Sequence, residues 1–333
     1  MRRYAGLLLV VCVVFMAGAA NLWAGGGQDS GSGPVTLRFS HGMAADGTFG
    51  QAALRFGEAV SRKTGGRYKV DVYHNAQLGS ERDTVEACQM GNLDFAVVNQ
   101  AVLANFIPEI SALDLPYIIE SKEHADAVFY GEVGDYYLGR LQNVGLAGLT
   151  YFESGFRNLT NNRRPVNSVT DVKGLRIRVM ENRIHQEAWR TLGADPVPMS
   201  WGDAYTAMQQ NAIDGQENPT VVAEQNHVGE VNKYIAITEH AYTTCFLIVS
   251  PKTWARISAG DQKLFLEAAQ EASRFNSEAS RSLEDASLKK MQDQGVSVTR
   301  PNKRDFIQAT APVREKFRGE FQDQIARIEK ARP

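Results

Sequence analysis

The chain has 333 residues, with 36 lysines and arginines against 38 aspartates and glutamates, which gives a net charge of −2. No basic stretch interleaves with aromatic side chains, so the composition argues against nucleic acid as a partner. The length exceeds what one hydrophobic core comfortably holds and therefore predicts two domains.

The N-terminus has the order of a secretory signal. Two arginines precede an apolar run over residues 5–20, and the small residue Ala24 ends the segment. The run is shorter than the ~20 residues of a membrane-spanning helix, so a cleaved signal over 1–24 and a periplasmic location are predicted. A Gly- and Ser-rich flexible leader is expected over 25–33. Removal of the signal leaves 34 basic against 38 acidic residues, a charge of about −4.

The first half of the mature chain alternates strands and helices. Short apolar or period-2 patterns predict strands at 35–40, 68–73 and 95–98. Between them, apolar residues at helical spacing predict helices over 50–64 and 82–90. This β-α-β order predicts a parallel sheet with helices packed on its faces.

The second half forms another α/β unit. Extended chain at 151–157 is predicted to cross into it. A strand at 176–179 and two helices, over 184–192 and 203–211, then follow. Extended chain returns at 234–249, rich in Ile, Val and Thr. The fold class predicted from these patterns is α/β with two units.

One unusually long helix is predicted over 259–292, because no proline and no glycine follows Gly260 in that stretch. Ser258 and Asp261 form a capping pair at its start. At 1.5 Å per residue the helix would reach roughly 50 Å, which is longer than a small domain is wide. We therefore expect it to pack along both units.

Two cysteines, Cys88 and Cys245, remain after signal removal. Export permits a disulfide, but two cysteines make no framework. Because both lie among apolar neighbours, small buried side chains are expected. Whether the two are paired is left open.

No catalytic constellation is visible. The chain lacks a Gly-x-Ser-x-Gly elbow, a Walker loop and a Gly-x-Gly-x-x-Gly fingerprint after a strand. The histidines at 41, 74, 124, 185, 227 and 240 never occur four residues apart, so no helical zinc site is predicted. We expect a protein that is not an enzyme and that holds no metal or cofactor.

Two arginines share one side of the predicted 176–179 strand. Arg176 and Arg178 alternate with apolar residues, so both side chains project from the same face. Arginine stays ionised and offers a planar fork of donors that fits a carboxylate. An arginine on such a strand is a candidate anchor for an organic acid.

Several short motifs occur in a fixed order along the chain. They are Asn75-Ala76-Gln77-Leu78-Gly79, Gly91-Asn92-Leu93-Asp94-Phe95, Leu113-Asp114-Leu115-Pro116-Tyr117, Gly155-Phe156-Arg157-Asn158-Leu159-Thr160-Asn161, Gly174-Leu175-Arg176-Ile177-Arg178-Val179 and Asp214-Gly215-Gln216-Glu217-Asn218-Pro219. In these motifs and their order, nearly the whole mature chain resembles the DctP-like substrate-binding proteins of tripartite ATP-independent periplasmic (TRAP) transporters.

The resemblance implies a two-lobe periplasmic-binding-protein fold with parallel and mixed sheets, a hinge, and a long helix that spans both lobes. The hinge is expected near Phe156 and Tyr242. Lobe I would comprise residues 34–154 with 244–283, and lobe II residues 155–243 with 284–333.

The resemblance also implies a ligand site. Arg178 matches the family's main carboxylate anchor, and Arg157 a second arginine that reaches the same ligand; a structural ion pair is the alternative for both. Asn218 matches a ligand contact, although it could instead cap a helix that begins near Thr220. Trp201 matches an aromatic residue that lies against the ligand, although tryptophan is more often part of a core.

Five further polar residues match contact positions of the family or follow predicted strands. For each, a capping or turn role is as reasonable as a ligand contact. Some family members have a carboxylate at the position of Asn99, where this chain has a neutral amide, so the arrangement of hydroxyl groups on the ligand is left open. The five residues are Asn99, Glu81, His41, Thr48 and His240.

The function implied is capture of an organic acid in the periplasm and delivery to a TRAP permease for uptake driven by an ion gradient. Residues 151–161 look most like members associated with sugar acids, so a hexuronate is the expected ligand. The expected partners are this small molecule and the membrane subunits of the permease, with no nucleic acid; monomer and homodimer are both left open. The alternatives are a secreted sugar-acid-processing enzyme and a ligand sensor that feeds a receptor.

Overall fold

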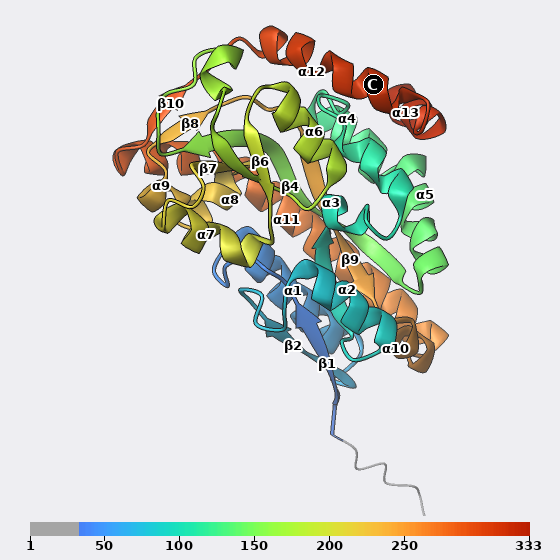
Figure 1. Cartoon of the computed structure of the whole chain (residues 1–333). Helices are drawn as coiled ribbons and strands as arrows, with labels where there is room; N and C mark the ends of the chain where they lie inside the picture. The colour runs from blue at the N-terminus through green and yellow to red at the C-terminus, as the bar shows by residue number, and fades with distance from the viewer. Residues whose placement is uncertain (1–32) are drawn as a thin grey trace, which may run out of the picture. The chain divides into compact units, whose positions relative to one another are not determined.

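Four strands and part of a fifth form the first sheet. In this computed structural model, which describes residues 33–333, β1 (Val35–Ser40) pairs in parallel with β2 (Tyr68–Tyr73) and with β3 (Phe95–Asn99). β9 (Tyr242–Val249) then joins antiparallel to β3. The predicted parallel β-α-β unit is confirmed, and the antiparallel strand makes the sheet mixed (Figure 1).

The predicted signal over 1–24, and all but the last residue of the predicted leader, lie outside the described residues. Within residues 33–333 no helix is both long and apolar enough to cross a membrane.

One long strand, β4 (Ala147–Asn161), belongs to both sheets. Its first part, up to Phe156, pairs antiparallel with β9. From Arg157 onward it pairs instead with strands of the second sheet. The register with β9 shifts between Glu153 and Gly155, and Gly155 has φ +110°, a backbone conformation that favours glycine. The predicted crossing at 151–157 therefore lies inside this strand.

The second sheet is built around β5 (Arg176–Val179). It pairs in parallel with β6 (Asp195–Pro198) and with β7 (Gly215–Pro219). β8 (Tyr234–Ala236) joins β4 and pairs with β10 (Ser297–Thr299). The extended chain predicted at 234–249 is thus two strands, interrupted by residues 237–241, where Glu239 has φ +46°.

The four helices predicted in the two α/β units begin and end within two residues of the observed ones. Helices over 122–129, 132–140, 303–318 and 322–330 were not predicted. The α-helices are α1 (Thr48–Lys63), α2 (Glu81–Met90), α3 (Gln100–Leu103), α4 (Lys122–Phe129), α5 (Glu132–Arg140), α6 (Arg183–Thr191), α7 (Trp201–Gln209), α8 (Thr220–Gln225), α9 (Val228–Val231), α10 (Pro251–Arg256), α11 (Ala259–Asp293), α12 (Lys303–Arg318) and α13 (Gln322–Lys330). The 3₁₀ helices are η1 (Pro108–Asp114), η2 (Leu141–Val144) and η3 (Val169–Val172).

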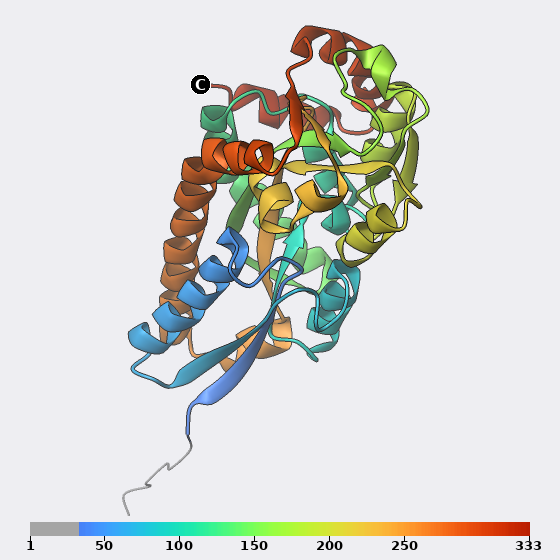
Figure 2. The ribbon, with the colours of Figure 1, turned by 90° about the vertical axis from the view of Figure 1, so that its left-hand side faces the viewer.

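The long helix α11 confirms the prediction for 259–292. The Ser258 hydroxyl accepts the Asp261 N–H at 3.1 Å and so caps the first turn. The helix contacts α1 and β4 and continues to α8 beside the second sheet, and Figure 2 shows it with α1 at its side. It therefore packs along both sheets, which its length made necessary.

Each sheet has its own apolar core. On one face of the first sheet, Phe39, Phe56, Phe95 and Phe265 pack ring against ring beneath α1 and α11. Separate clusters fill the faces of the second sheet. A further apolar cluster combines buried residues of both units, such as Phe246 and Ile184, so the units pack against each other as well as being joined by β4, β9 and α11. The boundaries predicted for the two lobes remain a prediction.

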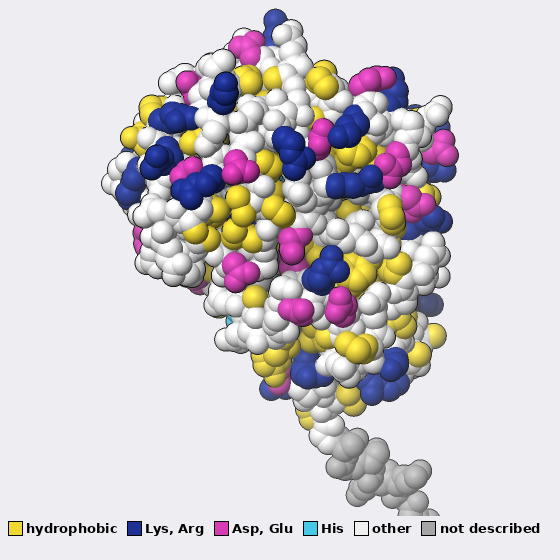
Figure 3. All heavy atoms as spheres, in the orientation of Figure 1, with side chains coloured by type: hydrophobic (Ala, Val, Ile, Leu, Met, Phe, Trp, Pro, Cys, Tyr) yellow, Lys and Arg dark blue, Asp and Glu magenta, His cyan; other side chains and the backbone are white. Residues whose placement is uncertain are grey.

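Cys88 and Cys245 are both buried, as expected for small core side chains, and no disulfide joins them in the described part of the chain. On the face seen in Figure 3, basic and acidic side chains are interspersed.

Candidate functional site

Arg178 is a fully buried cation that has no acidic partner among residues 33–333. It lies in the middle of the short strand β5 with 2 % of its surface exposed. Its Nε and Nη2 donate to the Met199 carbonyl at 3.0 and 2.8 Å, and its Nη1 contacts the Met180 sulfur at 3.5 Å. Within residues 33–333, no carboxylate lies within ion-pair distance of it. A guanidinium has five N–H groups, so these three contacts leave two of them free.

Burial lowers the pKa of Arg178 to about 10, because the charged form loses its hydration. Glu217 and Glu81 offset part of this effect and Arg157 adds to it. A buried charge is costly unless it is paired. The site is therefore arranged to receive a negative charge.

Trp201 lies beside this cation. It is the first residue of α7, and its ring centroid is 5.6 Å from the central carbon of the Arg178 guanidinium, which is a cation–π distance. Its side chain is only partly buried, although it also touches two of the apolar cores. Trp201 is therefore both a core side chain and a neighbour of Arg178.

A small enclosed pocket of about 20 Å³ adjoins Arg178. Glu81, at the N-terminus of α2, lines the pocket together with Trp201 and Gly42. Glu81 Oε1 accepts the backbone N–H of Asn99 at 3.4 Å, and burial raises the pKa of Glu81 to about 7 despite this hydrogen bond and the two nearby arginines. The pocket therefore combines the buried Arg178 cation with two acidic side chains, Glu81 and Glu181, and burial raises the pKa of the first of these acids.

Arg157, in contrast, has an acidic partner inside the protein. Both its Nε and its Nη2 bind the Glu217 carboxylate, the latter at 3.0 Å, and Nη2 also binds the Glu217 carbonyl. Its Nη1 donates to the Thr243 hydroxyl at 3.3 Å. The structural ion pair that the sequence left open is therefore present, and one N–H of Arg157 remains for a ligand.

Glu217 is the centre of a buried polar cluster. His240 Nε2 lies 3.0 Å from Glu217 Oε2, and His185 Nδ1 lies 3.7 Å from Oε1. Burial by itself would raise the pKa of Glu217, but Arg157, His240 and His185 together hold it well below its ordinary value. Burial lowers the pKa of His240 despite this carboxylate. His240 thus has internal partners on both ring nitrogens, since Nδ1 lies 2.9 Å from the Thr238 hydroxyl.

The remaining predicted residues have local partners. Asn218 donates to Gln216 Oε1 at 2.7 Å and does not cap a helix, because Pro219 occupies the N-cap of α8 without a side-chain hydrogen bond. Asn99 does cap a helix: its side chain accepts the Ala101 N–H at 3.0 Å. Of the two roles considered for Asn99, helix capping is the one seen in this structure.

His41 and Thr48 lie at the start of the first α/β unit and also contact the protein. His41 Nε2 is 2.8 Å from His74 Nδ1, and burial together with His74 lowers the pKa of His41 to about 3. The backbone N–H and hydroxyl of Thr48 contact Gln225 Oε1 at 3.1 and 3.4 Å. Neither side chain lines the pocket beside Arg178. The structure thus brings Arg178, Glu81 and Trp201 to one pocket, and the other predicted residues do not line it.

Sequence reasoning missed Glu217, Asp114 and His185 as members of this region. His185 Nε2 lies 3.3 Å from Asp114 Oδ1, and both side chains are buried. A signal for Glu217 was available: β7 reads Gly-Gln-Glu-Asn-Pro, and all five residues are buried. Polar residues in a central strand must find partners inside the protein.

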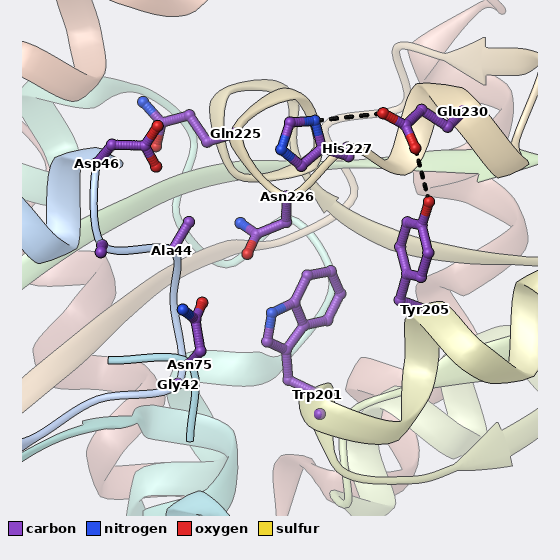
Figure 4. Close-up of a pocket in the computed structure, with 12 residues that line it drawn as sticks. Gly42, Ala44, Asp46, Asn75, Trp201, Tyr205, Gln225, Asn226, His227 and Glu230 are labelled. Atoms are coloured by element: carbon purple, nitrogen blue, oxygen red, sulfur yellow. Dashed lines mark hydrogen bonds and ion pairs between the residues drawn. The ribbon is translucent and has the colours of Figure 1, made fainter. Parts of the chain in front are cut away.

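A second, larger cavity of about 520 Å³ lies next to the Arg178 pocket, and Gly42, Trp201 and Gly202 line both. Figure 4 shows Trp201 and Tyr205 on one side and Asn75, Asn226 and His227 around the remaining space. Within residues 33–333, no cluster of side chains suited to a metal ion is present.

Sequence comparison assigns the chain to a protein family. The profile of bacterial extracellular solute-binding protein family 7 (DctP) matches residues 39–320. The chain belongs to this family. A solute-binding protein of Verminephrobacter eiseniae is 33 % identical over 288 residues, 86 % of each chain. The predicted resemblance is thereby confirmed.

Solved structures of the family agree with the fold. A TRAP periplasmic solute-binding protein from Polaromonas sp. JS666, bound to D-erythronate, has TM-score 0.87 and 33 % identity, and the match covers 89 % of this chain and 98 % of the other. One from Bradyrhizobium sp. BTAi1, in complex with D-galacturonate, has TM-score 0.85 and 34 % identity, with 89 % and 99 % covered. The predicted two-lobe α/β fold is confirmed. The members of this family are bacterial extracellular solute-binding proteins.

Proposed function

We propose that this protein captures a sugar acid in the periplasm by its carboxylate and delivers it to a TRAP permease. The observation that carries the proposal is the fully buried guanidinium of Arg178, which has no acidic partner in the described chain and lies beside a small pocket. A bound carboxylate would accept the two free N–H groups and compensate the buried charge. A neutral ligand could do only the first of these.

A hexuronate is the proposed ligand. Related proteins bind D-erythronate and D-galacturonate, and both are hydroxylated carboxylic acids. Beside Arg178, Glu81 and Ser200 line the pocket with groups that can bind hydroxyls, and Trp201 offers an apolar ring face. A short dicarboxylate would leave such groups desolvated and unpaired, at about 1–3 kcal/mol each.

Delivery needs affinity and a change of shape but no chemistry on the ligand. The two lobes, with the predicted boundaries at 154/155 and 243/244, would close about the region where β4 changes partners, near Phe156 and Tyr242. A ligand that contacts both lobes favours the closed state by its differential affinity. The permease would recognise that state and would draw on an ion gradient for uptake.

A thermal-shift screen of carboxylic acids tests the proposal. A ligand held at 100 times its Kd adds about 2.7 kcal/mol to the folded state, which is readily seen as a rise in Tm. Glucuronate or galacturonate should give the largest shifts, succinate and malate smaller ones, and glucose none. Largest shifts from dicarboxylates, with silent hexuronates, would overturn the choice of sugar acid. A hexuronate returned chemically changed would favour the enzyme alternative.

A further inference from the structure

The two adjoining cavities differ greatly in size. The pocket at Arg178 measures about 20 Å³ and its neighbour about 520 Å³. On such a scale one water molecule needs roughly 10–15 Å³, whereas ligand sites usually measure about 300–1,000 Å³. Only the larger cavity is therefore of ligand size in this structure. An acid anchored at Arg178 has room to continue past Trp201 into it.

Two glycines and one tryptophan border both cavities and so lie where the two cavities meet. Gly42 and Gly202 border both cavities, and a Cβ built on Gly42 would meet no atom within 4 Å. The indole of Trp201 forms the third side of this junction. A chain of atoms can thus leave the carboxylate site without displacing a side chain at Gly42.

Two aromatic rings form one wall of the larger cavity. Trp201 and Tyr205 are four residues apart on α7 and hence lie on the same helix face. The Tyr205 hydroxyl donates to Glu230 Oε2 at 2.8 Å, which holds the second ring in place (Figure 4). Flat apolar faces of this kind suit the C–H side of a sugar ring.

The opposite wall offers unused polar groups of both kinds. In the described chain, neither the Asp46 carboxylate nor the Asn75 amide has a hydrogen-bond partner in the protein. Gln225 uses its oxygen for Thr48, which leaves its NH₂ group. Asn226 donates to the Val222 carbonyl at 2.8 Å, which leaves its oxygen. Sugar hydroxyls both donate and accept, so they match a wall with free donors and free acceptors.

The charge of this wall selects against a second acid. Asp46 and Glu230 both line the cavity, and no lysine or arginine among the described residues does. Among the described residues that line the cavity, His227 is the only basic one, and its Nδ1 lies 3.5 Å from Glu230 Oε1. The far part of a bound molecule should therefore be hydroxylated and neutral.

We propose that the larger cavity is a second sugar subsite, so that the protein accepts an aldobiuronic acid: a hexuronate joined through its anomeric carbon to a neutral sugar. This inference rests on the proposed function, because it needs the uronate carboxylate at Arg178. In a hexuronate ring, the carboxyl group and the anomeric carbon lie on either side of the ring oxygen, so a substituent on the anomeric carbon can extend away from the anchor. The neutral sugar would lie between the rings of Trp201 and Tyr205 and the polar wall.

Titration calorimetry with glucuronate and with 6-O-glucuronosyl-galactose tests the subsite. The wild-type protein should bind the disaccharide at least as tightly as glucuronate. Tyr205→Ala should weaken disaccharide binding about tenfold, a typical cost for truncating an aromatic anchor. The effect on glucuronate should be much smaller, because its ring would lie at the junction lined by Gly42, Trp201 and Gly202, whereas Tyr205 lines only the larger cavity. Tyr205→Phe, which keeps the ring and loses the hydrogen bond to Glu230, is the matched control and should retain most of the disaccharide affinity.

A second arm tests the charge argument. Digalacturonate carries another carboxylate on its second ring and should bind less tightly than galacturonate. Asp46→Asn, which keeps the size of the side chain, should reduce that difference. Glucuronate binding without disaccharide binding, or an equal effect of Tyr205→Ala on both ligands, would overturn the subsite while leaving the proposed function standing. Failure of both uronates and disaccharides to bind would overturn both.

Discussion

The guanidinium of Arg178 lies over the indole ring of Trp201, with 5.6 Å between its central carbon and the ring centroid. The contact places a flat apolar surface directly beside a buried cation that has no acidic partner in the described chain. Arg157 is equally buried but is bound to Glu217. The two arginines therefore contribute differently: Arg178 is open to a ligand charge, whereas Arg157 is largely committed to the protein.

The first prediction concerns Arg178. Arg178→Ala should abolish ligand binding while the protein stays folded, because no ion pair in the described chain is lost with the side chain. Loss of one partner of a desolvated charge pair costs about 2–5 kcal/mol, or roughly thirtyfold and more in affinity. Arg178→Lys should fail as well, since a point charge does not replace a planar fork. Calorimetry and thermal unfolding of both variants check this, and near-native affinity in either would remove Arg178 as the anchor.

The second prediction concerns the buried pair of Arg157 and Glu217. Glu217→Gln should lower the free energy of unfolding by about 3–5 kcal/mol, because it leaves the Arg157 charge buried and uncompensated. Urea unfolding at neutral pH measures this loss. An exposed pair such as Arg62 and Glu271 is the control, and Glu271→Gln should cost less than about 1 kcal/mol. Equal effects of the two substitutions would contradict the assignment.

The same carboxylate predicts a pH dependence of stability. The folded-state pKa of Glu217 lies below its ordinary value, so the folded form binds this proton less readily than the unfolded form. Its contribution to stability is complete above the unfolded pKa of about 4.3 and is lost as the pH falls from there toward the folded pKa. Wild type and Glu217→Gln should therefore converge in stability on acidification below pH ~4, and a constant difference would count against the pairing.

A third prediction follows from Glu81, whose pKa burial raises to about 7. Above that pH its charge would repel a carboxylate ligand in the same pocket, so affinity should fall as the pH rises through 7. The ligand itself stays ionised, with a carboxyl pKa of about 4 or below. Calorimetry between about pH 5.5 and 8.5 should show this slope in wild type and lose it in Glu81→Gln. Affinity that rises with pH, or an unchanged slope in the variant, would contradict the role of Glu81.

The raised pKa of Glu81 should also affect the stability of the protein without ligand. Because the folded-state pKa lies above the unfolded value, the folded form holds its proton longer as the pH rises. Wild type should thus lose stability relative to Glu81→Gln between pH ~4.3 and 7. Urea unfolding of the two proteins across that range measures the difference.

The fourth prediction concerns closure about β4. Saturating hexuronate should reduce the radius of gyration in solution scattering, because the ligand favours the closed state. Gly155→Ala should weaken ligand binding and cost about 1–2 kcal/mol of stability, since φ at this residue is +110°. The added Cβ would meet only Pro219, at 3.6 Å, so crowding is not the cause.

Gly145→Ala is the matched control for closure. Its φ of +68° imposes a similar strain, and an added Cβ would meet no atom within 4 Å. It should lower stability without changing ligand affinity. Superimposable scattering curves with and without ligand would contradict closure, and so would an equal loss of affinity in both glycine variants.

The sequence alone determined most of the secondary structure, and through the family resemblance it named Arg178 as the candidate anchor. The apolar periods of α1, α2, α6 and α11 predicted helices whose ends differ from the observed ones by at most two residues. These patterns are local, because burial of one face repeats with the period of the element. The order of the motifs then identified the family and, through it, the two-lobe fold.

Only the tertiary structure decided which arginine is free. Both Arg157 and Arg178 lie in strands and directly follow an apolar residue, so this local pattern does not tell them apart. The pairing of β4 with β7 sets Arg157 opposite Pro219, so Glu217 is its diagonal neighbour on the next strand. The pairing of β5 with β6 and β7 provides Arg178 with no acidic partner in the described chain. Strand register joins residues far apart in the chain, and the long-range packing that sets it is not visible in a local pattern.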